Sequence, residues 1–528
     1  MSQMLKSSGL MALATLTSRL LGMVREIVYG AFMGTGWVAS AFFLAFQVPN
    51  LFRRLLGEGA LTAAFIPIFK EKEKRNGDAA MWQAANAVIS GLLVFTTLIV
   101  VCGFAGVTIA LFFGGQVTGE TTRFTGKTLL MLELLRVMMP YLLLVCLAAV
   151  FMGMLNARGH FFIPAMGAAT LNLVMIASVF WLAPRLGVGL HEQVFALAIG
   201  VVLAGLVQAW FQIPSLSREG FRYRWVNPWR DETVRRVVKQ MLPATLGVAA
   251  FQINVVTVNL LAYWVDDYVV ASFQYAVRLM ELPQGLFGIS LATYLLPTLS
   301  GLAAEKKFPE FRSELGKGVG YLVFVNLLAS VLLVVLAEPI MRLLFERGKF
   351  DATSTQQATL ALQCLAPGLV LFSLINVVAR AFYALGDTKT PMKISIFCLT
   401  LNLLLAAVLV WRYKQGGLGL ANTASAAVNF SLLTIALRKK LKQLEWATLR
   451  RALAPLLLAT ALAAGMAWWG WRSWEGALGH GNLALKLGAV FVPAIAAAIL
   501  YWLVTIGLKV PAAKEMLAFA QRKPAAKQ

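Results

Sequence analysis

The chain has 528 residues, of which 59% are hydrophobic and only 13% are charged. A soluble domain usually carries about 25% charged residues, so this chain has too little polar material to coat the several domains that a soluble protein of its length would form. Apolar stretches of about 20 residues, each long enough to cross a bilayer, recur along almost the whole chain. The composition excludes a soluble enzyme, a secreted protein and a disordered scaffold.

The expected fold is an all-α membrane protein with fourteen transmembrane helices. The apolar segments are too long and too uniform for barrel strands, and backbone exposed to lipid must satisfy its own hydrogen bonds. In chain order the predicted spans are 8–33, 38–69, 84–113, 128–156, 162–184, 192–214, 240–264, 268–300, 316–345, 354–383, 390–411, 417–437, 452–474 and 484–508.

The excess of 47 Lys and Arg over 24 Asp and Glu predicts the orientation. With both termini in the cytoplasm, about 31 cations fall on cytoplasmic segments and about 10 on outer ones, as the positive-inside rule requires. The densest basic stretches are 70–75, 218–239, 306–317 and 438–451. We interpret them as topology signals, with docking of anionic lipid or of a protein partner as the alternative. Nucleic acid is not an expected partner.

The two halves of the chain resemble each other. Phe151–Gly159, followed by Thr170-Leu-Asn-Leu173, matches Val378–Gly386, followed by Thr400-Leu-Asn-Leu403, at an offset of about 230 residues or six spans. Because six is even, both copies enter the membrane in the same sense, which predicts two six-helix lobes related as a parallel repeat. The expected division is 1–216 for the N-terminal lobe, 217–239 for a cytoplasmic linker, 240–441 for the C-terminal lobe, and 442–528 for two further helices and a basic tail.

Six cations are assigned to the interior of predicted spans, and all are arginine: Arg19, Arg25, Arg53, Arg54, Arg136 and Arg278. A charge at that depth costs about 2.5–3.5 kcal/mol, so each side chain should face a cavity, pair with an acid or reach an interface. Local pairing is expected for Arg54 with Glu58 and for Arg136 with Glu133.

The other four arginines are predicted to line an anion-binding cavity. A guanidinium matches phosphate oxygens in a bidentate way, whereas a lysine ammonium is only a point charge. Local pairing with Glu26, for Arg19 and Arg25, and with Glu281, for Arg278, is the alternative that the sequence leaves open.

Helix breakers occur at matching places in the two halves. Span 38–69 contains Pro49, Gly57 and Gly59, and span 268–300 contains Pro283, Gly285 and Gly288. Interrupted helices at corresponding positions indicate a central transport site, with a simple packing kink as the alternative.

Signals of an enzyme are missing from the sequence. The three histidines are far apart, and there is no zinc-binding H-E-x-x-H motif, paired-cysteine metal site or P-loop. The acidic pair Asp266-Asp267 is interpreted as an interfacial cap, with a membrane glycosyltransferase as the competing class. Transport without a nucleotide site must draw on an ion gradient or the membrane potential.

Several long motifs resemble the MurJ family of bacterial lipid II flippases, in the MOP exporter superfamily. They are Ser18–Glu26, Ala41–Arg54, Glu58–Pro67, Val238–Pro243, Arg278–Pro283 and Gly386–Pro391. The resemblance extends over essentially the whole chain and weakens after about residue 445. It implies a multi-pass protein of the bacterial inner membrane that is not an enzyme. It also implies two lobes around a cationic cavity and two C-terminal helices that form a groove for a polyprenyl tail.

The implied substrate is lipid II, undecaprenyl diphosphate carrying a disaccharide-pentapeptide. The family's essential arginines map onto Arg19, Arg25, Arg53 and Arg278, and its acidic, gating positions onto Glu26 and Glu281. Another polyprenyl-diphosphate-glycan flippase and a multidrug exporter of the same superfamily are the alternatives. Bilayer lipids and other cell-wall synthesis proteins are the further partners that it implies.

One departure and one open assignment follow from the resemblance. Many members carry an acid just before the Ala-Phe-Phe run, where this chain has Ser40. No cofactor is expected, but some members bind sodium in the C-terminal lobe. Asn254 and Asp387 are the candidate groups for sodium or another monovalent coupling cation.

Overall fold

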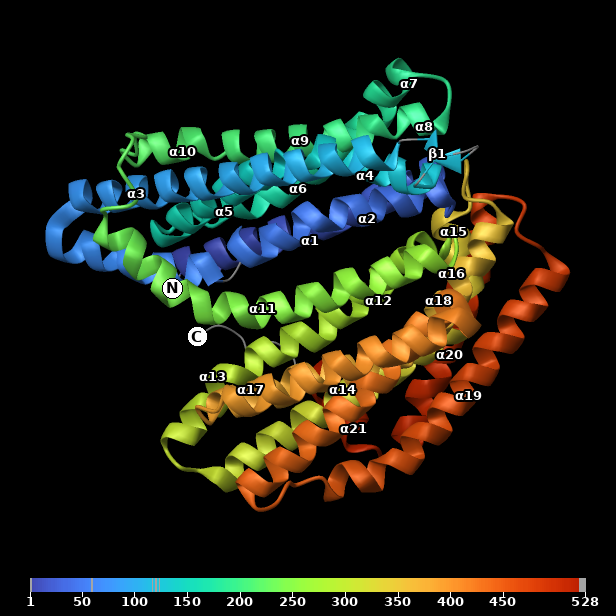
Figure 1. The fold of residues 1–528 in the computed structure, drawn as a ribbon. Helices are drawn as coiled ribbons and strands as arrows, with labels where there is room; N and C mark the ends of the chain where they lie inside the picture. Colours follow the sequence, from blue (N-terminus) through green and yellow to red (C-terminus); the bar gives the residue numbers. More distant parts are fainter. Residues whose placement is uncertain (1, 58–59, 116, 119–120, 123, 522–528) are drawn as a thin grey trace. The chain divides into compact units, whose positions relative to one another are not determined.

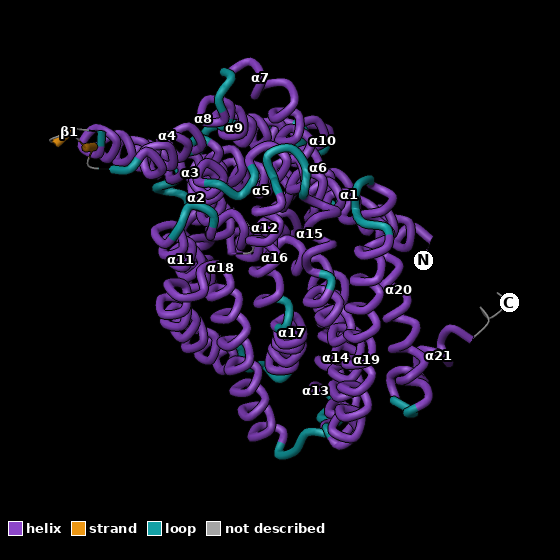
Figure 2. The backbone as a smooth tube through the Cα atoms, turned by 90° about the vertical axis from the view of Figure 1, so that its right-hand side faces the viewer, coloured by secondary structure: helices purple, strands orange, loops and turns teal. Residues whose placement is uncertain are grey.

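The computed structural model describes residues 2–57, 60–115, 117–118, 121–122 and 124–521. Within these residues the chain is helical apart from its loops and one short hairpin, β1 (Val117–Thr118) with β2 (Thr121–Thr122). Figure 2 shows helix along nearly the whole backbone. The all-helical fold predicted from the sequence is confirmed.

The chain divides into two compact units, Met1–Tyr263 and Trp264–Gln528 (Figure 1). The four-part division into lobes, linker and C-terminal helices stays a prediction. In the first unit the helices are α1 (Ser2–Met33), α2 (Trp37–Phe52), η1 (Arg53–Gly57), α3 (Ala60–Gly114), α4 (Gly126–Met138), α5 (Tyr141–Ala157), α6 (Phe162–Ala177), η2 (Ser178–Leu182), α7 (Ala183–Leu186), α8 (Leu190–Gln193), α9 (Phe195–Trp210), α10 (Ile213–Arg218) and α11 (Glu232–Val265).

The second unit contains the elements from α12 to α21. They are α12 (Val269–Pro283), η3 (Gln284–Ile289), α13 (Ser290–Ala304), α14 (Phe308–Val335), α15 (Ala337–Phe345), α16 (Ala352–Leu365), α17 (Gly368–Ala384), α18 (Lys389–Leu441), α19 (Ala447–Ala477), α20 (Leu483–Gly507) and α21 (Pro511–Gln521). The elements labelled η are π-helical turns.

Helices overlap every one of the predicted spans. Among the described residues, nine helices are long and apolar enough to cross a membrane, or up to eleven if each of two bent pairs counts as one span. Two long helices contain a break that separates two predicted spans. The break in α3 is at Gly77, with φ 77°, and the break in α18 is at Lys414, with φ 49°. The protein is therefore a multi-pass membrane protein, and the exact number of fourteen spans stays a prediction.

Each unit has its own apolar core. In the first unit a row of aromatic rings connects α3, α5 and the segment after α10, with Trp82 lying 5.6 Å from Phe69 and 5.5 Å from Phe221 between ring centroids. In the second unit α14 packs against α17, α19 and α20, and the buried Tyr501 hydroxyl donates to the Phe324 carbonyl at 2.7 Å. The two C-terminal helices α19 and α20 therefore pack against the core of the second unit.

Candidate functional site

Two helices are interrupted at the positions that the breakers predict. Helix α2 contains Pro49 and continues into the π-helical turn η1, and α12 ends at Pro283 and continues into η3. A proline removes one amide donor from the helical ladder, and π-helical turns are rare and frequent at functional sites. The predicted interruptions are therefore present in both halves of the chain.

Arg25 lies on α1 with its guanidinium largely enclosed. Its side chain is 12% exposed and forms an ion pair with the buried Glu26 carboxylate. Arg25 Nη1 also donates to Asn172 Oδ1 at 3.0 Å, and the guanidinium lies 5.8 Å from the centroid of the Tyr29 ring. Local pairing with Glu26 is present, and it acts together with a second partner from another helix.

Asn172 joins α6 to α1 at two points. Besides accepting from Arg25, its amide nitrogen donates to the Ser18 carbonyl at 3.2 Å, and the residue is only 6% exposed. This asparagine therefore holds Arg25 at a defined place beside the segment that carries Arg19. Sequence reasoning noted Asn172 only as part of the internal repeat. A polar amide in an otherwise apolar span was the signal that pointed to it.

The two other site arginines of the first unit differ in exposure. Arg19 is an exposed residue of α1, and Arg53 is a half-buried residue of η1. Arg53 Nε donates to Asn50 Oδ1 at 2.8 Å, one turn earlier on the same element pair. The predicted partner of Arg54, Glu58, lies outside the described residues.

Arg278 lies on α12 in the second unit. Its Nη1 donates to Glu281 Oε2 at 2.8 Å, and the two side chains are 35% and 48% exposed. A pair this open to its surroundings stabilises the protein little. Three of the predicted arginines thus belong to the first unit and one to the second. Their convergence on one cavity stays a prediction.

The structure gives two findings on arginines outside the four predicted site residues. In the described part of the chain Arg136 has no carboxylate within 4.0 Å, so its expected pairing with Glu133 is wrong. Both side chains are half-buried instead. Arg380, which the span prediction leaves near a helix end, lies inside α17, where its guanidinium is 5.8 Å from the Tyr383 ring centroid. No ion-pair partner of Arg380 occurs among the described residues. The signal in the sequence that pointed to Arg380 was the presence of an arginine, and not a lysine, at this position.

The candidate coupling-ion residues have protein surroundings of their own. Asp387 accepts from Lys440 Nζ at 2.7 Å and from the Thr390 amide and hydroxyl at 3.0 and 2.8 Å. The Lys440 contact is the main reason why the pKa of Asp387 falls to about 2, with the Thr390 bonds contributing. A cation bound there would have to displace the lysine ammonium. Asn254 is 9% exposed on α11. The described residues contain no cluster of three or more acidic, His or Cys side chains that could hold a metal ion.

Two further positions singled out from the sequence have defined places. Ser40, at the position of the missing acid, is fully buried on α2. Asp266 accepts from Lys414 Nζ at 2.8 Å and from the Asp267 amide at 2.7 Å. These contacts agree with a structural cap.

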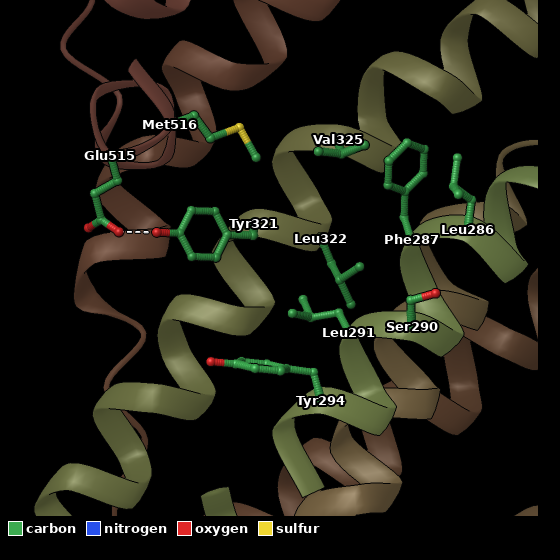
Figure 3. A pocket seen from close by; sticks show the side chains of 10 residues that line it. All are labelled: Leu286, Phe287, Ser290, Leu291, Tyr294, Tyr321, Leu322, Val325, Glu515 and Met516. Atoms are coloured by element: carbon green, nitrogen blue, oxygen red, sulfur yellow. Dashed lines mark hydrogen bonds between the residues drawn. The ribbon is translucent and has the colours of Figure 1, made fainter. Parts of the chain in front are cut away.

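A pocket of about 810 Å³ adjoins the π-helical turn of the second unit (Figure 3). Side chains from η3, α13, α14 and α21 line it, and most of them are apolar: Leu286, Phe287, Ser290, Leu291, Tyr294, Tyr321, Leu322, Val325, Glu515 and Met516. At one side the Tyr321 hydroxyl donates to the Glu515 carboxylate of α21. The lining suits a hydrocarbon chain.

Comparison with known proteins places this arrangement in a family. Residues 30–488 match the family model described as "Lipid II flippase MurJ". A relative from Vibrio cholerae serotype O1, named "Probable lipid II flippase MurJ", is 34% identical over 472 residues, or 87% of this chain and 89% of the relative.

Solved structures of other proteins share the fold of this chain. The structure described as "Lipid II flippase MurJ, inward closed conformation" matches with a TM-score of 0.74 at 22% identity, over 95% of this chain and 99% of that one. An inward-facing multidrug resistance MATE transporter of the MOP superfamily matches with a TM-score of 0.64 at 18% identity, over 82% and 99%. The family model and the Vibrio relative both extend over most of the sequence, and the chain therefore belongs to the lipid II flippase MurJ family.

Proposed function

We propose that this protein moves lipid II from the inner to the outer leaflet of the bacterial inner membrane. Arg19, Arg25, Arg53 and Arg278 bind the diphosphate of the head group, and Glu26 and Glu281 hold Arg25 and Arg278 when the substrate is absent. Both termini are in the cytoplasm. The observation that carries the proposal is the enclosed guanidinium of Arg25, held from two helices in a membrane protein of this family.

The chemistry of the site supports an anionic ligand. Each guanidinium carries five N–H donors, and the structure pairs Arg25 with Glu26 and Asn172 and Arg278 with Glu281. Charge-assisted hydrogen bonds to a diphosphate replace the hydration that the head group loses on leaving water. An inside-negative potential favours outward movement of an anion by about 2.3 kcal/mol per charge per 100 mV.

The pocket beside η3 offers a place for part of the polyprenyl tail. Leu286, which lines the pocket, is eight residues after Arg278, or about 12 Å along a helix. A diphosphate at Arg278 and the first isoprene units in the pocket are therefore compatible with one extended ligand. The groove expected along the two C-terminal spans remains a second path for the rest of the tail.

The two alternative functions are a multidrug exporter and another polyprenyl-diphosphate-glycan flippase. A multidrug exporter that carries cationic drugs needs acidic groups in its cavity, whereas this chain supplies arginines from α1, η1 and α12. The MATE transporter that resembles it shows only the shared fold, at 18% identity. Another polyprenyl-diphosphate-glycan flippase would use the same diphosphate contacts, and only the identity of the glycan distinguishes it.

Arg25→Ala and Arg278→Ala test the proposal. Each variant should fold, yet fail to restore growth of a flippase-depleted strain and fail to translocate labelled lipid II in vesicles. Arg136→Ala is the matched control, because it removes an arginine from a spanning helix outside the proposed site and should keep activity. Full activity of both site variants would overturn the assignment. The same vesicles with and without sodium, and with imposed voltage, identify the coupling ion.

A further inference from the structure

The segment between α10 and α11 is an ordered strap lying against α3. We define the strap as residues 221–230, which form neither helix nor strand and end in a turn at 228–230. Its first residue, Phe221, is 6% exposed and packs against Trp82 of α3 and Phe151 of α5. A linker of this kind needs such contacts to have one conformation, because ordering the backbone costs conformational entropy.

Two polar residues of α3 hold the strap in place. Asn86 Nδ2 donates to the Arg222 carbonyl at 3.1 Å, and Ser90 Oγ accepts from the Val226 amide at 3.3 Å and lies 3.2 Å from the Tyr223 hydroxyl. Both residues are at most 5% exposed. A Cβ atom at Gly91 would lie 3.3 Å from Pro228 Cβ, so the glycine permits this close approach.

The outer side of the strap carries arginine and tryptophan together. Arg222, Arg224 and Arg230 are exposed, and no carboxylate of the described residues lies within 4.0 Å of them. The side chains of Trp225 and Trp229 are 61% and 76% exposed.

The strap itself contains three arginines and no acid. Glu219 accepts from Arg158 at 2.8 Å and pairs with His160, and Asp231 accepts from the Thr233 amide at 2.8 Å. The strap therefore presents net positive charge beside two indole rings.

The position of the strap along α3 matches the border of the lipid-facing surface. Ser90 contacts the strap, and Phe95, 51% exposed, is the first of a row of exposed apolar side chains that continues with Leu98 and Val101. Five residues of helix correspond to about 7.5 Å. Tryptophan is enriched at this depth, where its ring meets headgroups, and arginines near an anionic membrane surface are attracted to it.

We propose that the strap is a docking site for the headgroups of anionic phospholipids in the surrounding bilayer. The guanidinium groups bind lipid phosphates in bidentate fashion, and the two indoles lie among the headgroups and first methylenes. A basic loop that only sets topology needs neither a pinned backbone nor paired exposed tryptophans. The inference does not depend on lipid II being the transported substrate.

Tryptophan quenching in reconstituted bilayers tests the proposal. Full-length protein is placed in phosphatidylcholine nanodiscs in which an equal fraction of lipid is brominated, either as phosphatidylglycerol or as phosphatidylcholine. Subtracting the fluorescence of the W225F/W229F variant leaves the contribution of the two strap tryptophans. We expect brominated phosphatidylglycerol to quench these two indoles roughly threefold or more above brominated phosphatidylcholine, and salt to reduce the difference.

Charge variants identify the residues that cause the preference for phosphatidylglycerol. R222Q/R224Q/R230Q should remove it, whereas R438Q/K439Q/K442Q, which removes three exposed cations from the end of α18 and the loop after it, should keep it. Equal quenching by both lipids in the wild-type protein would overturn the proposal. Equal loss in both triple variants would also overturn it, because it would indicate non-specific attraction to overall charge. The wild-type comparison stands even if a variant folds poorly.

Discussion

Asn172 illustrates how a single uncharged residue can determine the geometry of a charged one. Arg25 and Glu26 are neighbours on α1, so their ion pair alone would not fix the guanidinium relative to the other helices. The second bond, from Arg25 Nη1 to Asn172 Oδ1, comes from α6 and restricts that freedom. Asn172 is anchored in turn by its bond to the Ser18 carbonyl. We infer that Asn172 positions Arg25 and does not itself bind the diphosphate.

Asn172→Leu should therefore impair transport more than folding. Losing a hydrogen bond to a charged group costs about 1.5–3 kcal/mol, equivalent to about a ten- to hundredfold fall in the rate of lipid II translocation if the bond is needed for binding. Translocation of labelled lipid II in vesicles measures the rate, and thermal unfolding measures the fold. Asn422→Leu is the control, because among the described residues the Asn422 amide donates to Leu418 of its own helix, at 2.9 Å, and to no other helix. Equal rates for the wild type and Asn172→Leu would contradict a positioning role.

At the scale of elements, one arginine connects the short helix α15 to the C-terminal hairpin of α19 and α20. Arg342, 13% exposed, donates to Glu338 at 2.6 Å on its own helix and to Glu475 of α19 at 3.0 Å. Glu346, just after α15, also pairs with Lys486 of α20 at 3.4 Å. These contacts explain how a hairpin without a partner in the internal repeat is attached to the second unit.

Arg342→Gln should destabilise this attachment. Losing a hydrogen bond to a charged group costs about 1.5–3 kcal/mol, and Arg342 donates such bonds to both Glu338 and Glu475. We expect the melting temperature of the purified protein, followed by tryptophan fluorescence, to fall by several degrees. Lys349→Gln, which removes an exposed cation in the loop after α15, should leave it unchanged. Similar melting temperatures for Arg342→Gln and Lys349→Gln would argue against the network as the attachment.

At the scale of the whole molecule, what the sequence could predict depended on whether the signal was local. Spans follow from apolar length, and the interruptions follow from Pro49 and Pro283, so both were predictable. Contacts between distant residues were not: Asn172 is 147 residues from Arg25, and Ser90 is 136 from Val226. Arg380 was missed for a different reason, because hydropathy does not separate an arginine inside a helix end from one in a loop.

The orientation of the molecule in the membrane is a prediction from the cation distribution and can be tested directly. Gly481, between α19 and α20, and Lys442, just after α18, are both exposed and lie on opposite sides in the predicted topology. Each is replaced by cysteine in a chain whose four native cysteines are changed to alanine. In intact spheroplasts a membrane-impermeant maleimide should label position 481 and should reach position 442 only after permeabilisation. Detergent-solubilised protein, in which both positions should react, is the control. Labelling of 442 but not 481 would mean that the basic loops face outward, and the proposed direction of transport would then have to be reversed.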